Sequence, residues 1–285
     1  MNKNILPSVA AVTAFAVAVL LGACSNPQNS VTETVSCKDS SQFVKFSMEC
    51  EIPVVSSPAD AAIRDSIISR AVLELERFGS FEQPHRLPEF EGDCNDMKAL
   101  ISFYGHETFL YLESLAQEDM QERIGYTMFL PAWEYTADVR KISESASYVV
   151  YESRNYIYMG GAHGGVTGEG QMTFRKSDGR LIESFIRPGS ELELQDALKE
   201  GLLSYYSQYE DGLSSYGDIR PRLFLDTDSI IPLPMWAPYP SGEGLVLTYQ
   251  QYEIAPYSDG MPSFTVPYKT VRRYMTKEAK RITGK

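Results

Sequence analysis

A histidine among four glycines, in Gly160-Gly161-Ala162-His163-Gly164-Gly165, is the segment of the chain whose residue types best suit chemistry. Glycine permits positive φ and close backbone approach, so the N–H groups of Gly161 and Gly164, together with His163, could bind an anion or an oxyanion. The segment lacks the lysine of a phosphate-binding loop, and no helix is expected after it. The alternative, which the sequence favours, is a strained connection between two strands.

Catalysis needs more than one histidine, because the ring must have a nucleophile to activate and a carboxylate to orient it. The chain has no Gly-x-Ser-x-Gly segment, and His106-Glu107 lacks the second histidine of a zinc protease helix. Its three histidines, and four cysteines without Cys-x-x-Cys spacing, give a zinc site little support. We therefore expect no metal, no cofactor and no catalytic residue.

The stretch from Tyr249 to Gly260 is the second candidate site. It places Tyr252 and Tyr257 in a turn marked by proline and glycine, and Trp236 comes shortly before it. Exposed aromatic rings combine apolar area with a polar tip, so Tyr252, Tyr257 and Trp236 are candidate ligand-binding residues. The alternative, which the sequence favours, is that these rings pack against a sheet.

Small residues just before Cys24, in Leu21-Gly22-Ala23-Cys24, indicate a bacterial lipoprotein signal. Lys3 supplies the positive start, and the following apolar core carries no charge. The alternative is a transmembrane helix, but the core is shorter than the roughly 20 apolar residues that a span prefers, and Pro7 interrupts it. We predict that residues 1–23 are removed and that Cys24 carries lipid.

The polar residues after the lipidation site show no hydrophobic periodicity. Residues 24–42 are therefore predicted to form a flexible tether, with order beginning near Phe43. Ser25 and Asn26 follow the cysteine, and no aspartate comes directly after it. In this respect the chain resembles lipoproteins sorted to the outer membrane, so we expect a lipid anchor there rather than in the inner membrane.

The charge of the 285-residue chain restricts its partners. With 26 basic and 38 acidic residues, the formal net charge is -12, which argues against nucleic acid because phosphates would repel the protein. An acidic surface would attract a cationic protein; the alternative is that the acidity only keeps the protein soluble. A hydrophobic content of 43% and a mean hydropathy of -0.24 indicate a globular body.

Three cysteines remain if Cys24 is acylated: Cys37, Cys50 and Cys94. One disulfide and one free thiol would be the natural outcome in an oxidising compartment. Cys50 falls on the apolar side of a predicted strand, so it could instead be buried as a thiol. The sequence leaves the pairing open.

Two hydrophobic periods alternate along the chain. In residues 44–52, apolar residues alternate with polar or charged ones, as in a half-buried strand. A helix is predicted to follow. It starts at a Ser57-x-x-Asp60 box, carries an apolar stripe from Ile63 to Leu75 and ends at Gly79. Helices between blocks of antiparallel strands make α+β the expected class, with antiparallel sheets and helices packed on one side. The further predicted elements are helices at 95–118, 191–206 (with Leu192, Leu194, Leu198, Leu202 and Leu203 inward) and 268–276, strands at 126–142, 146–159, 170–176, 222–233, 244–253 and 263–266, and a turn at Asp178-Gly179.

Three segments in this order, Tyr158–Gly164, Asp178–Arg180 with the leucine-rich helix after it, and Tyr252–Gly260, resemble the RsiV-like domain pair. The pair occurs in a lysozyme-sensing anti-sigma factor and in the non-catalytic part of the deacetylase PdaC. The resemblance implies two intertwined α+β subdomains, a PdaC N-terminal-like domain at 43–165 and an RsiV-like C-terminal domain at 166–277. The chain shows neither a sigma-binding segment nor a deacetylase metal motif.

Two functions follow as hypotheses. The first is a lipid-anchored, non-catalytic protein of the cell envelope that binds or senses a ligand. The resemblance and the charge suggest a cationic protein such as lysozyme, or the glycan of peptidoglycan. The second is an envelope hydrolase or transferase that uses His163 with an acidic partner.

Overall fold

The computed structural model describes residues 30–76, 85–122, 131–160, 165–226 and 230–285. The predicted signal peptide and Cys24 lie outside them, as do Gly79, residues 126–130 and the segment 161–164 with His163. Within the described residues, no helix is long and apolar enough to cross a membrane.

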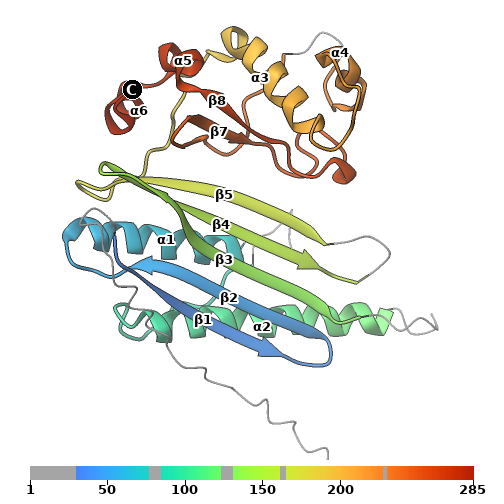
Figure 1. The fold of residues 1–285 in the computed structure, drawn as a ribbon. Helices are drawn as coiled ribbons and strands as arrows, with labels where there is room; N and C mark the ends of the chain where they lie inside the picture. Colours follow the sequence, from blue (N-terminus) through green and yellow to red (C-terminus); the bar gives the residue numbers. More distant parts are fainter. Residues whose placement is uncertain (1–29, 77–84, 123–130, 161–164, 227–229) are drawn as a thin grey trace, which may run out of the picture.

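The larger of two sheets has five strands, and helices cover one of its faces (Figure 1). Its second and third strands are parallel, and the other neighbours are antiparallel. Parallel strands need a crossover, which α1 (Pro58–Glu76) and α2 (Met97–Glu122) provide. The strands, in their order across the sheet, are β1 (Thr32–Ser40), β2 (Val44–Pro53), β3 (Trp133–Glu144), β4 (Tyr148–Tyr158) and β5 (Val166–Arg175).

The predicted alternation in β2 and the predicted stripe of α1 face each other. Every second residue of β2 from Val44 to Ile52 is buried, and α1 buries Ile63, Ile67, Ile68, Ala71 and Leu75 in the same core. The helix start is also as predicted, because the Asp60 N–H donates to Ser57 Oγ at 3.2 Å while the Ser57 hydroxyl donates to the Asp60 carboxylate at 2.8 Å.

The prediction of a flexible tether was wrong for residues 32–40, which form the edge strand β1. All nine residues of β1 pair with β2, and Val35 and Cys37 pack against the core under α2. Backbone pairing and this narrow apolar contact suffice to order a strand made mainly of serine, threonine and charged residues. Ordered structure therefore begins well before Phe43.

The cysteines of the described residues are free thiols, so the expected disulfide is absent there. Cys37 and Cys50 lie on neighbouring strands and both face the helices, but they are not opposite each other. The cross-strand partner of Cys37 is Met48, and that of Cys50 is Val35. Burial raises the pKa of the Cys37 thiol to about 11 and that of Cys50 to about 12, which makes both poor nucleophiles. Cys94 is exposed, before α2.

The five-stranded sheet with α1 and α2 forms the first unit of the molecule, and the residues after β5 form the second. In the second unit, α3 (Glu191–Tyr206) lies beside a three-stranded antiparallel sheet (Figure 1). The predicted bounds of α3 are confirmed, but Leu192 points outward with 69% of its surface exposed. It lies off the stripe formed by Leu194, Leu198 and Leu202. The remaining elements are α4 (Tyr216–Ile219), β6 (Tyr239–Pro240), β7 (Gly244–Thr248), β8 (Ser263–Pro267), α5 (Tyr268–Val271) and α6 (Lys277–Thr283), with 3-10 turns at Arg220–Arg222, Tyr257–Asp259 and Arg272–Tyr274.

The strand predicted at 222–233 was wrong: its described residues after Arg222 form no strand. The Phe224 N–H donates to the Ile254 carbonyl and the Ile231 N–H to the Gln195 side chain, so these donors serve no strand ladder. The predicted final helix is broken at Met275, which forms a bridge with Ile186.

Strand β4 joins the two units because its first residues are buried on both faces. Val149 and Tyr151 belong to the core under α1 and α2, whereas Tyr148 and Val150 belong to the core of the second unit. The chain enters the second unit only after β5, so the predicted boundary between residues 165 and 166 falls inside one sheet.

Replacing Gly201 by alanine tests the contact between α3 and β8. Alanine favours a helix interior by about 1 kcal/mol over glycine. A Cβ at Gly201, however, would lie 2.1 Å from Phe264 Cδ2. We expect the overlap to dominate and Gly201→Ala to lower the free energy of unfolding by about 1–3 kcal/mol, measured by urea denaturation. Gly217→Ala, whose Cβ would meet no atom closer than 3.4 Å, is the matched control. A more stable Gly201→Ala variant would contradict this packing.

Candidate functional site

The tyrosine-rich stretch folds into a tight turn after β7. The Glu253 N–H donates to the Gln250 carbonyl at 3.1 Å, which closes the turn. The Glu253 carboxylate accepts from the backbone N–H groups of Gln250 at 2.7 Å and Met235 at 2.6 Å. Tyr249 anchors the base of the turn: its ring is buried and its hydroxyl donates to the Pro232 carbonyl.

Tyr252 sits at the third position of this turn with a φ of 65°, the only positive φ of a non-glycine residue among the described positions. Such a position favours glycine or asparagine, and a bulky side chain there strains the backbone by about 1–2 kcal/mol. The strain brings no burial in return, because 59% of Tyr252 is exposed. A strained, outward-facing aromatic residue is typical of functional sites.

Further exposed apolar side chains lie on segments that are hydrogen-bonded to the turn or to the residues just after it. Met235 is 73% exposed and its backbone is tied to Glu253; Phe224 is 57% exposed and its backbone is tied to Ile254. Tyr209, 76% exposed, stacks edge-on against Tyr205, whose hydroxyl donates to the Asp259 carbonyl. We call the set formed by Tyr209, Phe224, Met235, Tyr252 and Tyr257 the Tyr252 surface.

The Tyr252 surface touches the other motif singled out by the sequence. The Tyr257 ring lies 5.9 Å from that of Tyr252, and its hydroxyl donates to the Gly165 carbonyl at 2.7 Å. Two residues on, the Thr167 N–H donates to the Gln251 side chain at 2.8 Å. The tertiary structure thus joins the glycine-rich segment to the tyrosine turn. Of the predicted site residues there, Gly161, His163 and Gly164 lie outside the described residues.

Trp236, which directly follows Met235 of the Tyr252 surface, lies in the contact between the two units. Its ring packs over Gly170 of β5, where an added Cβ would be 3.4 Å away, and the Arg70 guanidinium lies 4.0 Å from its centroid. With Ser153 and Asn155 these residues surround a cavity of only about 40 Å³. The contact gives Trp236 a packing role between α1 and β5.

Carboxylates stand near the Tyr252 surface. Exposed Glu210 holds Arg222 in an ion pair, and the Arg222 guanidinium lies 5.7 Å from the centroid of the Tyr206 ring. The Tyr206 hydroxyl donates to Asp259, and burial, together with this carboxylate, raises the pKa of Tyr206. Asp226 is exposed two residues after Phe224.

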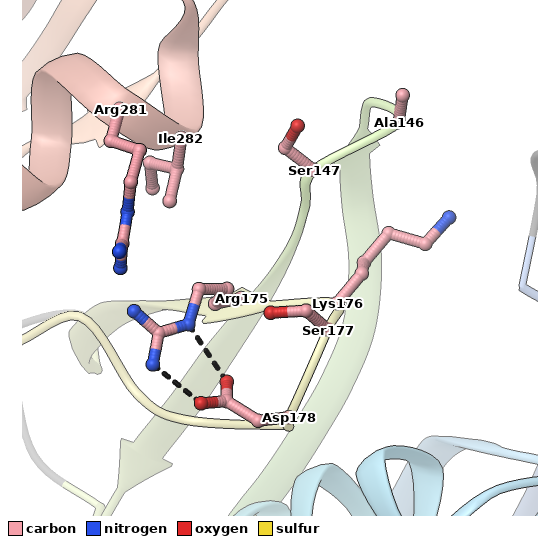
Figure 2. A pocket seen from close by; sticks show the side chains of 8 residues that line it. All are labelled: Ala146, Ser147, Arg175, Lys176, Ser177, Asp178, Arg281 and Ile282. Atoms are coloured by element: carbon pink, nitrogen blue, oxygen red, sulfur yellow. Dashed lines mark hydrogen bonds and ion pairs between the residues drawn. The ribbon is translucent and has the colours of Figure 1, made fainter.

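A separate cavity of about 620 Å³ lies at the other end of β5, and the sequence reasoning missed it. Figure 2 shows Arg175 at the end of β5 between Asp178 of the following turn and Arg281 of α6, whereas the Lys176 side chain points away from Arg281. Arg175 binds both carboxylate oxygens of Asp178 and reaches Glu278 of α6 at 2.6 Å. The feature of the sequence that could have indicated this cavity is the concentration of lysine and arginine near the C-terminus.

The histidine and acidic side chains of the described residues form few close groups. No group of three or more His, Cys, Asp or Glu side chains there could hold a metal ion. His106 Nδ1 lies 2.8 Å from an Asp39 oxygen, a pair that links α2 to β1 on the helix-covered side of the sheet.

The comparisons with known proteins agree on a fold. Residues 237–269, which include β6 to β8 and the Tyr252 turn, match a family model described as a protein of unknown function (DUF3298). A DUF3298 protein from Bacteroides fragilis NCTC 9343 superposes with a TM-score of 0.63 at 16% identity, covering 89% of this chain and 97% of that chain. A DUF3298 protein from Pseudomonas aeruginosa PAO1 gives 0.58 at 16% identity, with the same coverage. No curated protein matches.

The chain is therefore an α+β protein with the fold of these DUF3298 structures. Its Tyr252 turn lies in the segment that the DUF3298 family model recognises. The finer likeness to the RsiV-like pair stays a prediction.

The bond between Arg175 and Asp178 predicts a stability change in acid. It lowers the pKa of Asp178 from 3.8 to about 2. A carboxyl whose pKa is lower in the folded state stabilises the protein above its unfolded pKa and loses that contribution as the pH falls through its folded pKa. We expect wild-type stability to lose this contribution between about pH 4 and pH 2, and Asp178→Asn to lack it already at pH 7. Melting temperatures across this range, with Ser177→Ala as control, measure it; parallel curves for wild type and Asp178→Asn would contradict it.

Proposed function

We propose that this protein is a lipid-anchored, non-catalytic binding protein of the bacterial envelope, and that the Tyr252 surface binds its ligand. The observation that carries the proposal is Tyr252 itself, held outward on a strained backbone among other exposed apolar side chains. Exposed apolar clusters of this kind mark interaction sites, and tyrosine is enriched at the energetic centres of interfaces. A lipidated Cys24 would hold the protein at the outer membrane.

We propose a cationic protein such as lysozyme as the preferred ligand, with the glycan of peptidoglycan as the alternative. The exposed Asp226 near the Tyr252 surface and the net charge of -12 support a cationic ligand. Complementary charge accelerates association and makes it sensitive to salt, whereas an uncharged glycan stacked on tyrosine would bind with little salt dependence.

Tyr252→Gly separates a binding role from a structural one. Glycine relieves the positive φ, so we expect unchanged or higher thermal stability. Loss of the ring should weaken lysozyme binding by about 30-fold, as expected for a central interface tyrosine, measured by isothermal titration calorimetry. The same titration at rising salt, and a pull-down on insoluble peptidoglycan, distinguish the two ligands.

Leu110→Ala is the matched control, because Leu110 is 45% exposed on α2, away from the Tyr252 surface. It should leave binding unchanged. Destabilisation by Tyr252→Gly would show that the ring is structural. Failure of the wild-type protein to bind either lysozyme or peptidoglycan would remove the proposal.

The anchor is tested separately. Cys24→Ala should leave the precursor uncleaved and unacylated, and intact-mass measurement of wild-type protein from cells should show a chain that begins at Cys24 with added acyl mass. Wild-type protein with an unmodified amino terminus would contradict the lipoprotein proposal while leaving the Tyr252 surface untested by that result.

A further inference from the structure

We infer that the end of the molecule formed by α6 and the cavity of Figure 2 is a docking surface for anionic phospholipid headgroups, and that it holds the Tyr252 surface away from the bilayer. The inference rests on the proposed lipid anchor. It concerns how the anchored body is oriented, which a lipid on a chain terminus alone leaves undetermined.

The charge of the chain is divided unevenly. The last 17 residues hold seven lysines and arginines and one glutamate, whereas the whole chain has 26 basic and 38 acidic residues. A basic segment in an acidic protein indicates a partner of negative charge for that segment. Its exposed cations are Lys269, Arg272, Arg273, Lys277, Arg281 and Lys285.

The cavity contains two further cations, Arg175 and Lys176, but both are held in ion pairs. Arg175 is neutralised by Asp178 and Glu278, and Lys176 by Glu144, so these two mainly hold the end together. Arg281 points into the same cavity with 67% of its side chain exposed, and its contact with Glu278 is long, at 3.6 Å (Figure 2). The charge available to a partner is therefore that of Arg281 and its exposed neighbours on α6.

The first described residue of the chain lies at this same end. Ser30 donates through its N–H and its hydroxyl to Glu144, both at 2.7 Å, and Lys141 donates to the Ser30 carbonyl at 2.8 Å. Glu144 also accepts from Lys176 of the cavity at 2.5 Å. The Glu144 carboxylate thus links Ser30 to the end of the molecule formed by α6 and the cavity, which we call the basic end.

Covalent geometry then limits how far the basic end can lie from the membrane. Cys24 and Ser30 are six positions apart in the sequence, and six such steps span at most about 20 Å. An acyl group on Cys24 would keep Ser30, and the cations beside it, within this distance of the headgroups. Electrostatic attraction acts within a Debye length of about 8 Å, a distance that a body on this tether can reach without unfolding.

The direction of β5 places the Tyr252 surface at the far end. Gly165 and Thr167, at the start of β5, contact Tyr257 and Gln251, whereas Arg175 ends the strand in the cavity. Ten residues of strand cover about 30 Å. A body docked through its basic end would therefore present the Tyr252 surface away from the membrane.

The test uses the lipid-modified protein, purified from cells and reconstituted in vesicles of phosphatidylcholine alone or mixed with phosphatidylglycerol. Hydrogen exchange of residues 277–283 and 176–180 should be slower on the anionic vesicles and return to the phosphatidylcholine value at high salt. Each lysine or arginine near an anionic surface strengthens association about fivefold, so the double variant Arg281→Gln, Lys285→Gln should lower the docked fraction relative to the undocked one by about 30-fold.

The matched control is Lys38→Gln with Lys45→Gln. Both lysines are exposed and flank the β1–β2 turn, at the other end of the sheet (Figure 1). This variant should keep the protection. Equal hydrogen exchange on both vesicle types would overturn the inference, and so would an equal loss of protection in both double variants. Protection from exchange by a soluble polyanion, without any protection by vesicles, would also overturn it. Intact mass of the same sample reports the anchor independently; flotation of an unacylated sample with anionic vesicles would still test the basic end.

Discussion

Four consecutive residues of β4, from Tyr148 to Tyr151, alternate between two hydrophobic cores, and the rest of the structure depends on this double burial. Full burial of a large apolar side chain is worth about 1.5–3 kcal/mol, so the four together contribute about 6–12 kcal/mol. That is comparable with the whole stability of a typical domain. Separating the two units would expose one side of this strand. The units therefore behave as one body, in which a surface on one has a fixed position relative to the other.

Strand β5 carries that fixed position across the molecule. It is the last strand of the large sheet, and an unpaired edge would invite association with other chains. Gln251 and Tyr257 cover its beginning, and Trp236 packs on its face at Gly170. The same contacts that protect the edge also hold the tyrosine turn in place, so protection of the sheet and presentation of the Tyr252 surface are two results of one interface.

The turn is over-determined, which explains how the strain at Tyr252 persists. The Glu253 carboxylate accepts two backbone N–H groups, and Ile254 and Ala255 are buried directly after it. These contacts fix the backbone conformation of Tyr252 and direct its side chain away from the core. With the exposed tyrosine turn at one end of β5 and positive charge at the other, the two ends of the molecule differ in character, as the proposed attachment to a membrane surface requires.

By itself, the sequence determined the elements whose pattern is local: the alternation of β2, the capped start of α1 and the leucine stripe of α3 all follow from neighbouring residues. It also identified the tyrosine turn as a candidate site. Only the tertiary structure decided that the polar residues 32–40 pair as a strand, that the segment after Arg222 does not, and that Trp236 packs between α1 and β5. It alone joined Ser30 to Lys176, a residue of the cavity beside the C-terminal helix, through Glu144. The physical reason is that periodicity records which face of an element is buried, whereas hydrogen bonds and ion pairs between distant segments depend on where the packed cores bring those segments together.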